Sequence, residues 1–264
     1  MLIETHAHLD YPDFAGDFDD VLERATAAGV TRIITIGTSL ESSRRAVELA
    51  EKYPNIFAVI GVHPTYVEES QEDVIDPLRE LAKERKAQVF AKALQTSTED
   101  QIEADIHDGA YKSKQASLFE QQLELAVEMG LNVVIHQRDA WEDTLALMQP
   151  YGGKLRGVFH CFGGTLEQAK EVIDLDHLVS FTGIVTFKNG AAVRDVAAQL
   201  PLWKFMVETD CPYLAPVPFR GKRCEPAHTR IVAETIAAAR GIALDEIAEA
   251  TSATAEAFFR FKRA

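Results

Sequence analysis

The chain carries five side chains that could bind metal ions together, and each follows a short apolar run: His6, His8, His136, His160 and Asp210. His6 and His8 are separated by one residue. Because side chains alternate along a β-strand, both imidazoles of this pair would point to the same side. Imidazole and carboxylate ligands together suit zinc, manganese or iron, whereas magnesium prefers more oxygen ligands. Ions held in this way activate water for hydrolysis, so the side chains predict a hydrolytic metal centre.

Eight short apolar runs, often rich in β-branched residues, alternate with amphipathic segments along the chain. They predict β-strands at Leu2–Thr5, Arg32–Gly37, Ile56–Gly61, Gln88–Ala93, Asn132–His136, Arg156–His160, His177–Thr182 and Lys204–Glu208. A helix after each strand implies parallel pairing with right-handed crossovers. The closed form of this pattern is the (β/α)8 TIM barrel, which we expect as a single domain over residues 1–264. An open doubly wound sheet is the alternative, but its polar residues would gather at one switch point instead of at many strand ends.

Helical patterns lie between the predicted strands. Apolar residues at helical spacing predict a helix over Asp17–Gly29, which its last glycine can end. Thr165–Gln168 has the pattern of a capping box that opens a helix. Ser113–Gly130 is a further predicted helix, and the acidic, turn-rich segment Thr96–Lys112 is expected to be an exposed loop at the mouth of the barrel.

The composition is that of an acidic globular protein, and it narrows the classes of function. The 264 residues include 27 lysines and arginines against 41 aspartates and glutamates, a net charge of −14. Such a surface repels the phosphate backbone of duplex nucleic acid, but a strand end or a small phosphorylated substrate could still enter a local pocket. Apolar stretches stay short of the roughly 20 residues that span a membrane, and neither a membrane segment nor a signal peptide is expected. Three cysteines favour reduced thiols in the cytoplasm.

Six blocks of the sequence match one protein family in order: Thr5–Asp10, Gly61–Pro64, Ile135–Ala140, Phe159–Gly164, Glu208–Leu214 and Arg220–Pro226. Through them the chain resembles the TatD-related hydrolases of the amidohydrolase superfamily over essentially its whole length. The resemblance implies a metal-dependent hydrolase, usually a deoxyribonuclease that trims DNA from an end, with up to two divalent ions such as zinc, manganese or magnesium. It also implies that Asp210 accepts the proton of the attacking water, and that the metal ligands are His6, His8, His136, His160 and Asp210.

The sequence departs from the family pattern at the fourth predicted strand. The pattern there is Gly-Glu-x-Gly-Leu-Asp-Tyr, whose glutamate bridges the two metals, whereas this chain has Ala91–Ser97 with Lys92 at the glutamate position. An ammonium group at that position would repel two divalent cations. In one interpretation Lys92 is carboxylated by CO2 and bridges the metals as a carbamate, as in related members of the superfamily. In another the site is degraded and binds one metal or none. In a third the segment is a damaged or engineered part of an otherwise normal enzyme. Impairment ranks slightly above carboxylation, because the glycines are lost as well.

Two further regions are candidates for substrate binding. His63 follows the third predicted strand and could hold a substrate phosphate, or could bond only to its own loop. Arg220 and Arg223 form, with Lys222, the one dense basic cluster, in the loop after the eighth strand. Loops after strands seven and eight often bind phosphate in such barrels, and a merely solvated loop is an equal alternative.

Other polar residues are expected to support the ligands. Arg138 and Asp139 come shortly after His136, and we predict that they form a buried ion pair that supports the ligand shell, with direct contact to the substrate as the alternative. Cys161 and Cys211 directly follow predicted ligands and are interpreted as small core residues.

The sequence therefore predicts a divalent-metal-dependent hydrolase of phosphodiesters, most closely a TatD-like deoxyribonuclease acting on DNA ends, with an activity that Lys92 could impair. A non-catalytic TatD-like protein that binds nucleotide or a partner protein is one alternative. A lactonase- or amidase-type hydrolase with a carboxylated Lys92 is the other. The expected partner is DNA with single-stranded ends or a small phosphorylated substrate; a membrane is not expected, and a monomer is favoured.

Overall fold

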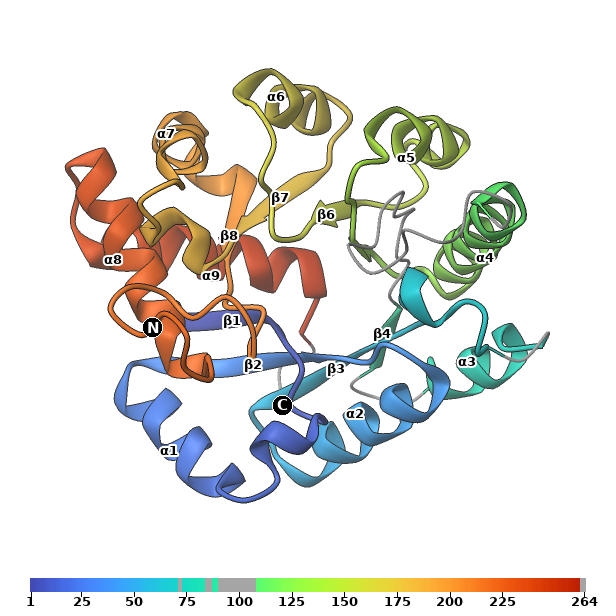
Figure 1. Cartoon of the computed structure of the whole chain (residues 1–264), viewed down its shortest axis with the longest axis horizontal. Helices are drawn as coiled ribbons and strands as arrows, with labels where there is room; N and C mark the ends of the chain where they lie inside the picture. The colour runs from blue at the N-terminus through green and yellow to red at the C-terminus, as the bar shows by residue number, and fades with distance from the viewer. Residues whose placement is uncertain (71–72, 84–86, 90–107, 262–264) are drawn as a thin grey trace.

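Strands and helices alternate along the chain, and the helices form a ring around the strands (Figure 1). The computed structural model describes residues 1–70, 73–83, 87–89 and 108–261. The strands are β1 (Leu2–Ala7), β2 (Val30–Ile36), β3 (Ile56–Ile60), β4 (Ala87–Val89), β5 (Val133–Ile135), β6 (Gly157–Phe159), β7 (Leu178–Phe181) and β8 (Phe205–Val207). The α-helices are α1 (Phe18–Ala27), α2 (Leu40–Lys52), α3 (Ile75–Leu81), α4 (Asp108–Met129), α5 (Trp141–Met148), α6 (Leu166–Asp174), α7 (Ala191–Gln199), α8 (Thr229–Arg240) and α9 (Leu244–Phe259).

All strand pairs are parallel, and together they form a (β/α)8 barrel. Hydrogen bonds join the strands into two four-stranded sheets, ordered β1-β2-β3-β4 and β5-β6-β7-β8. The sheets meet at both junctions, where β8 lies against β1 and β4 against β5, and a parallel bridge pairs Ala7 with Cys211. The predicted barrel is confirmed, and each predicted strand overlaps an observed one. For the fourth predicted strand, residues 90–93 lie outside the described part of the chain.

The barrel interior is apolar and is closed at one end by α9. Side chains from seven strands meet there, among them Ile3, Ile34, Val59, Val158 and Met206, and Phe258 and Phe259 of α9 pack against them. The side-chain amide of Asn132, just before β5, donates to the carbonyl of Phe258. Because α9 thus covers the amino-terminal ends of the strands, the carboxyl-terminal ends are left for a site.

Local sequence signals account for several helix ends. Thr165 and Gln168 form the predicted capping box at the start of α6. Gly29, two residues after the end of α1, has φ of +85°, a conformation that favours glycine. Among the described residues, no helix is long and apolar enough to cross a membrane.

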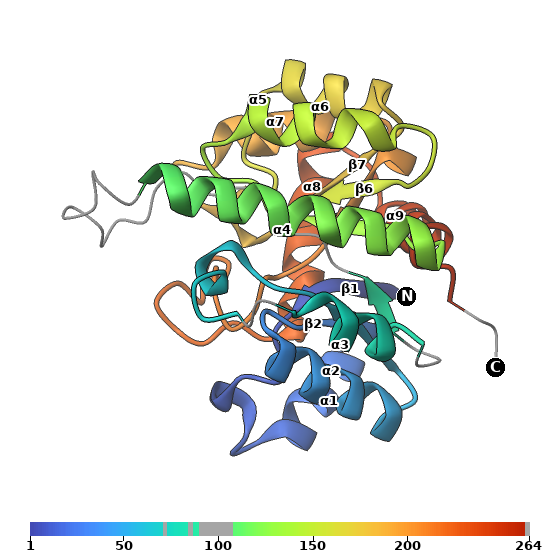
Figure 2. The same cartoon turned by 90° about the vertical axis from the view of Figure 1, so that its right-hand side faces the viewer.

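The first turn of α4 corrects the predicted loop at the barrel mouth. The predicted loop covered residues 96–112, but α4 already begins at Asp108, and residues 96–107 lie outside the described part. The hydroxyl of Tyr111 and the amide of Gln115 both donate to the carbonyl of Pro64, in the loop after β3. This contact fixes the start of α4, which lies between α3 and α5 (Figure 2).

His177, just before β7, makes stability depend on pH. Its ring is buried, its Nδ1 accepts the amide proton of Gly157 at 3.0 Å, and burial lowers its pKa from 6.5 to about 4. In the unfolded chain this imidazole takes up a proton below its ordinary pKa, whereas in the folded chain it stays neutral. The stabilisation is therefore complete above pH 6.5 and is lost as the pH falls towards 4.

Replacing His177 by asparagine, which retains an acceptor, is expected to remove this part of the pH dependence. Between pH 7 and pH 4 the unfolding free energy of the native protein should fall by up to about 3 kcal/mol more than that of His177→Asn. Urea denaturation of both proteins at several pH values measures the difference. Parallel pH profiles would show that His177 titrates normally in the fold.

Candidate metal centre

The five predicted ligands converge at the carboxyl-terminal end of the barrel. His6 lies within β1 and His8 just beyond it, His136 and His160 directly follow β5 and β6, and Asp210 follows β8. Parallel strands carry all their carboxyl-terminal ends on one face, which brings residues from four strands together. Among the residues that the structure describes, ligand atoms within 4.8 Å of one another form two sets, which share His6: His6, His8 and Asp210; and His6, His160 and Glu208.

The first set joins the ends of β1 and β8. The amide of Asp210 donates to the carbonyl of His6 at 2.9 Å, and the amide of His8 donates to the carbonyl of Cys211 at 2.8 Å. One carboxylate oxygen of Asp210 then lies 3.5 Å from Nε2 of His6 and 3.4 Å from Nε2 of His8. Asp210 has φ of +61°, so backbone conformation and backbone hydrogen bonds together aim its carboxylate.

The tautomer of His8 makes this first set a fitting place for a cation. Nδ1 of His8 lies 2.9 Å from the carbonyl oxygen of Ile36, which can only accept, so Nδ1 carries the proton. In the neutral ring Nε2 is therefore an acceptor, and it faces the carboxylate of Asp210, which is an acceptor as well. A divalent ion between the two groups satisfies both, so the residues present fit a metal.

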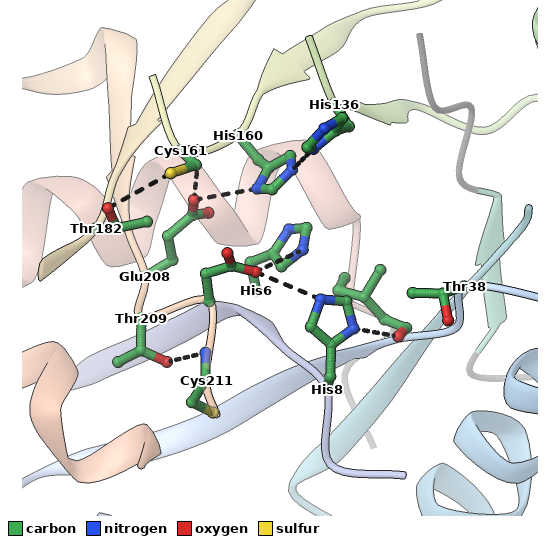
Figure 3. A network of polar contacts seen from close by, with 12 residues as sticks. His6, His8, Thr38, His136, His160, Cys161, Thr182, Glu208, Thr209 and Cys211 are labelled. Atoms are coloured by element: carbon green, nitrogen blue, oxygen red, sulfur yellow. Dashed lines mark hydrogen bonds and ion pairs between the residues drawn. The ribbon is translucent and has the colours of Figure 1, made fainter. Parts of the chain in front are cut away.

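The second set combines two stacked imidazoles, those of His6 and His160, with the carboxylate of Glu208, and His136 lies beside it. The rings of His6 and His160 are parallel within 11°, with centroids 3.8 Å apart. Nε2 of His160 lies 2.9 Å from Nδ1 of His136, and its Nδ1 lies 3.6 Å from a carboxylate oxygen of Glu208 (Figure 3). His160 is thus held between His136 at the mouth and Glu208.

Sequence reasoning missed Glu208 as a functional side chain. It is buried, accepts the amide proton of Cys161 at 2.7 Å, and lies within 3.4 Å of the hydroxyl of Thr5. A carboxylate beside the second nitrogen of a ligand histidine fixes the tautomer and the orientation of the ring. Glu208 directly follows β8, two residues before Asp210, so the rule that identified the other strand-end residues could have found it.

Replacing Glu208 by glutamine is expected to weaken metal binding about 10- to 100-fold, the usual contribution of a carboxylate behind a ligand histidine. Competition with a chromogenic chelator measures the affinity. Glu249→Gln, on the exposed side of α9, is the matched control and should bind metal like the native protein. Equal affinities for Glu208→Gln and the control would contradict the orienting role.

A second buried carboxylate, Glu4, lies beneath the first ligand set and was also missed. It is fully buried, and desolvation raises its pKa to about 8 against the opposing effect of its hydrogen bonds. One of its oxygens accepts the amide protons of His6 at 2.8 Å and of Thr209 at 3.0 Å. The other accepts the hydroxyl proton of Thr229, at the start of α8, at 2.5 Å. Glu4 therefore ties β1, the segment after β8 and α8 together directly behind the ligands.

The ligands open into a cavity of about 840 Å³. Its lining includes His136, His160, Asp210, Arg138 and Tyr213. Ligand groups of both sets therefore border a space large enough for a substrate.

The structure brings His63 to this site. Its ring centroid lies 4.6 Å from that of His136, and its Nδ1 contacts the hydroxyl of Thr65 at 2.7 Å and accepts the Thr65 amide proton at 3.2 Å. The predicted bond to its own loop is thus present, and the ring also lies beside a ligand.

Arg220 and Arg223 of the basic cluster have different surroundings. The guanidinium of Arg220 lies 3.9 Å from the ring centroid of Phe187, and Arg220 is exposed. Arg223 instead donates to the carboxylates of Asp17 and Glu225, and the Arg223 guanidinium holds the pKa of Asp17 well below its usual range. These ion pairs fasten the loop after β8 to the start of α1, and they favour a structural role for Arg223.

The prediction that Arg138 and Asp139 form a buried ion pair is wrong about the burial. The two charged groups are 4.0 Å apart, and their side chains are 50% and 64% exposed. Glu208 and Glu4 occupy the buried positions behind the ligands, which leaves this pair at the surface.

Cys211 is buried as predicted, whereas Cys161 is only partly buried; the cysteines are free thiols. Lys92 lies outside the described residues, so its predicted role stays a prediction.

Comparisons with known proteins agree with this geometry. Residues 3–260 match the model of the TatD related DNase family. The chain is 37% identical to the uncharacterized metal-dependent hydrolase YabD of Bacillus subtilis, over 98% of this chain and 99% of that protein. It is 32% identical to the 3′-5′ ssDNA/RNA exonuclease TatD of Citrobacter rodentium, over 98% and 97% of the two chains. The crystal structure of YjjV, a TatD homologue of Escherichia coli, superposes with a TM-score of 0.89 at 29% identity, over 99% and 98% of the chains. The chain therefore belongs to the TatD family of metal-dependent hydrolases.

Proposed function

We propose that this protein hydrolyses phosphodiester bonds at the ends of single-stranded DNA. The observation that carries the proposal is the pair of ligand sets beside an open cavity of about 840 Å³. Within each set the ligand atoms lie within 4.8 Å of one another. The name of the Citrobacter rodentium relative, a 3′-5′ ssDNA/RNA exonuclease, supports the substrate class.

Two groups of side chains would each bind one divalent ion. His6, His8 and Asp210 would hold one divalent ion. His136 and His160, whose facing ring nitrogens lie 2.9 Å apart at the edge of the second set, would hold another. Zinc, manganese and magnesium are the candidates. Such ions lower the pKa of a bound water and neutralise charge on the phosphodiester.

The protein's own side chains position the reactants and move the proton. Asp210 lies against both His6 and His8, so its carboxylate can accept the proton of the water that attacks phosphorus. His8 is held in one tautomer by the carbonyl of Ile36, and Glu208 orients His160. His63 lies beside His136 and is placed to donate to a phosphate oxygen at the mouth.

The charge of the protein favours a strand end over a duplex. A net charge of −14 repels the long phosphate backbone of a duplex, whereas an unpaired end exposes few phosphates outside the cavity. Arg220, on the loop after β8, offers a positive charge for such a phosphate. The free cysteines support a reducing, cytoplasmic location.

The test is hydrolysis of end-labelled DNA by the native protein in magnesium, manganese or zinc, with a chelator as control. We expect metal-dependent shortening of single strands from one end, faster than that of duplexes. Lactone and amide substrates are assayed in parallel. Hydrolysis of lactones without hydrolysis of DNA would replace the nuclease proposal by that of a lactonase. Tight nucleotide binding without any turnover would leave a binding protein.

A further inference from the structure

We infer that the exposed ring of Tyr213, supported by Tyr11, is a stacking platform for the unpaired nucleobase next to the scissile phosphodiester. The inference rests on the proposed function and extends it from the phosphodiester to the base that the phosphodiester carries. It defines the substrate class as a strand end with a base, as opposed to a small phosphorylated compound without one.

Tyr213 combines wide exposure with a fixed position beside the ligands. Its side chain is 55% exposed, and it lines the same cavity as His136, His160 and Asp210. Its backbone amide donates to the carbonyl of Asp210 at 3.0 Å, which ties the backbone at Tyr213 to that of a ligand. A large aromatic ring that is exposed to water at the wall of a reaction site offers an apolar surface on which part of a substrate can bind.

Tyr11 supports the ring of Tyr213 from one side. The Tyr11 ring stacks on His8, with centroids 4.9 Å apart and planes within 19°, and meets Tyr213 edge to face, with centroids 6.3 Å apart at 83°. Its hydroxyl contacts that of Thr38 at 3.4 Å. Tyr11 is therefore held on both sides, and Tyr213 rests against a fixed partner.

The two rings lie where a strand would leave the ligands. Tyr213 borders the cavity of the ligands, and Tyr11 borders a neighbouring cavity of about 730 Å³ that also contains Thr38 and Tyr66. The tyrosine pair thus stands between the two spaces. A base on the Tyr213 ring would leave its own phosphodiester at the ligands and direct the rest of the strand towards the second cavity.

The chemistry of the platform points to a nucleobase of any type. Each base offers a flat π-face that stacks on an aromatic side chain, and such stacking tolerates changes of sequence. The neutral phenol of Tyr213 offers ring area and a hydroxyl instead of charge. The platform therefore predicts affinity for unpaired ends with little preference between bases.

The test compares a single-stranded oligonucleotide with an otherwise identical one whose terminal nucleotides are abasic. Native protein, Tyr213→Phe and Tyr213→Leu are assayed on both, with the abasic positions placed at either the 3′ or the 5′ end. On the normal end, Tyr213→Leu should lose about tenfold in kcat/KM, and Tyr213→Phe should match the native protein. On the abasic end the three proteins should be equal.

A binding measurement separates this inference from the proposed function. Fluorescence anisotropy in chelator reports the affinity of each protein for both oligonucleotides without hydrolysis. A native preference for the base-bearing end that Tyr213→Leu loses supports the platform, even where no DNA is cut. DNA cutting with equal losses on both ends overturns the platform and leaves the nuclease proposal standing. A loss in Tyr213→Phe as large as in Tyr213→Leu assigns the hydroxyl instead of the ring, and overturns it too. Equal affinity of the native protein for the base-bearing and the abasic oligonucleotide would also overturn the platform.

Discussion

Replacing Lys92 by glutamate is expected to strengthen metal binding and to raise hydrolysis of single-stranded DNA by about a hundredfold or more. The family resemblance implies that Lys92 takes the place of a glutamate that bridges the metals. At an effective dielectric constant of about 20, two unit charges 4 Å apart interact by about 4 kcal/mol, and tenfold in affinity corresponds to about 1.4 kcal/mol. At the position that the family resemblance implies for Lys92, reversing its charge would therefore change the affinity for divalent ions by more than a hundredfold.

The control for this experiment is a charge reversal of the same size elsewhere. Lys170→Glu, exposed on α6, changes the net charge equally and should leave metal binding and turnover at native levels. Metal stoichiometry is measured together with the rate on labelled single-stranded DNA. A native protein that already cuts as fast as Lys92→Glu would contradict impairment. If its rate then falls when bicarbonate is removed, the carbamate interpretation replaces it.

Replacing Asp210 by asparagine is expected to lower kcat/KM on single-stranded DNA about a thousandfold, within the usual range for removal of a general base. The carboxylate lies within 3.5 Å of both His6 and His8, so the substitution removes a ligand and a proton acceptor together. The backbone bond between Asp210 and His6 does not involve the side chain, and the fold should persist.

The comparison is made in the native and the Lys92→Glu backgrounds, so that the starting rate is measurable. Asp195→Asn, exposed on α7, is the matched control and should retain full activity. Raising the metal concentration separates the two roles. Recovery of the native rate at saturating metal would show that Asp210 acts only as a ligand, and would contradict its assignment as the base.

Much of the fold and most of the ligand set could be predicted from the sequence, because both follow from local periodicity. Apolar runs of strand length, each followed by a helical pattern, specify parallel pairing. Parallel pairing alone brings the residues at strand ends onto one face. His6, His160 and Asp210, far apart in the chain, meet for this reason.

The start of α4 shows where local periodicity is insufficient. The segment before Ser113 is acidic and rich in turn-forming residues, so its pattern predicted a loop. Hydrogen bonds from Tyr111 and Gln115 to Pro64 instead hold the first turns of α4 against the loop after β3. The partner lies 47 residues away from Tyr111, and a window of local sequence cannot contain it.

The sequence by itself determined the barrel and the strand-end residues that we propose as ligands, while only the tertiary structure decided how each charged group is used. In the sequence, Glu4 and Glu208 are part of predicted strands. In the structure, desolvation and bonds to distant residues, such as Thr229 at 225 positions from Glu4, place them behind the proposed ligands as supporting carboxylates. For Arg223 the sequence left phosphate binding and a solvated loop as equal alternatives, and only the structure shows its counter-charge, Asp17, 206 positions away. The physical reason is that hydrophobic periodicity is a property of short stretches of the chain, whereas burial and charge pairing depend on which distant residues the closed barrel brings into contact.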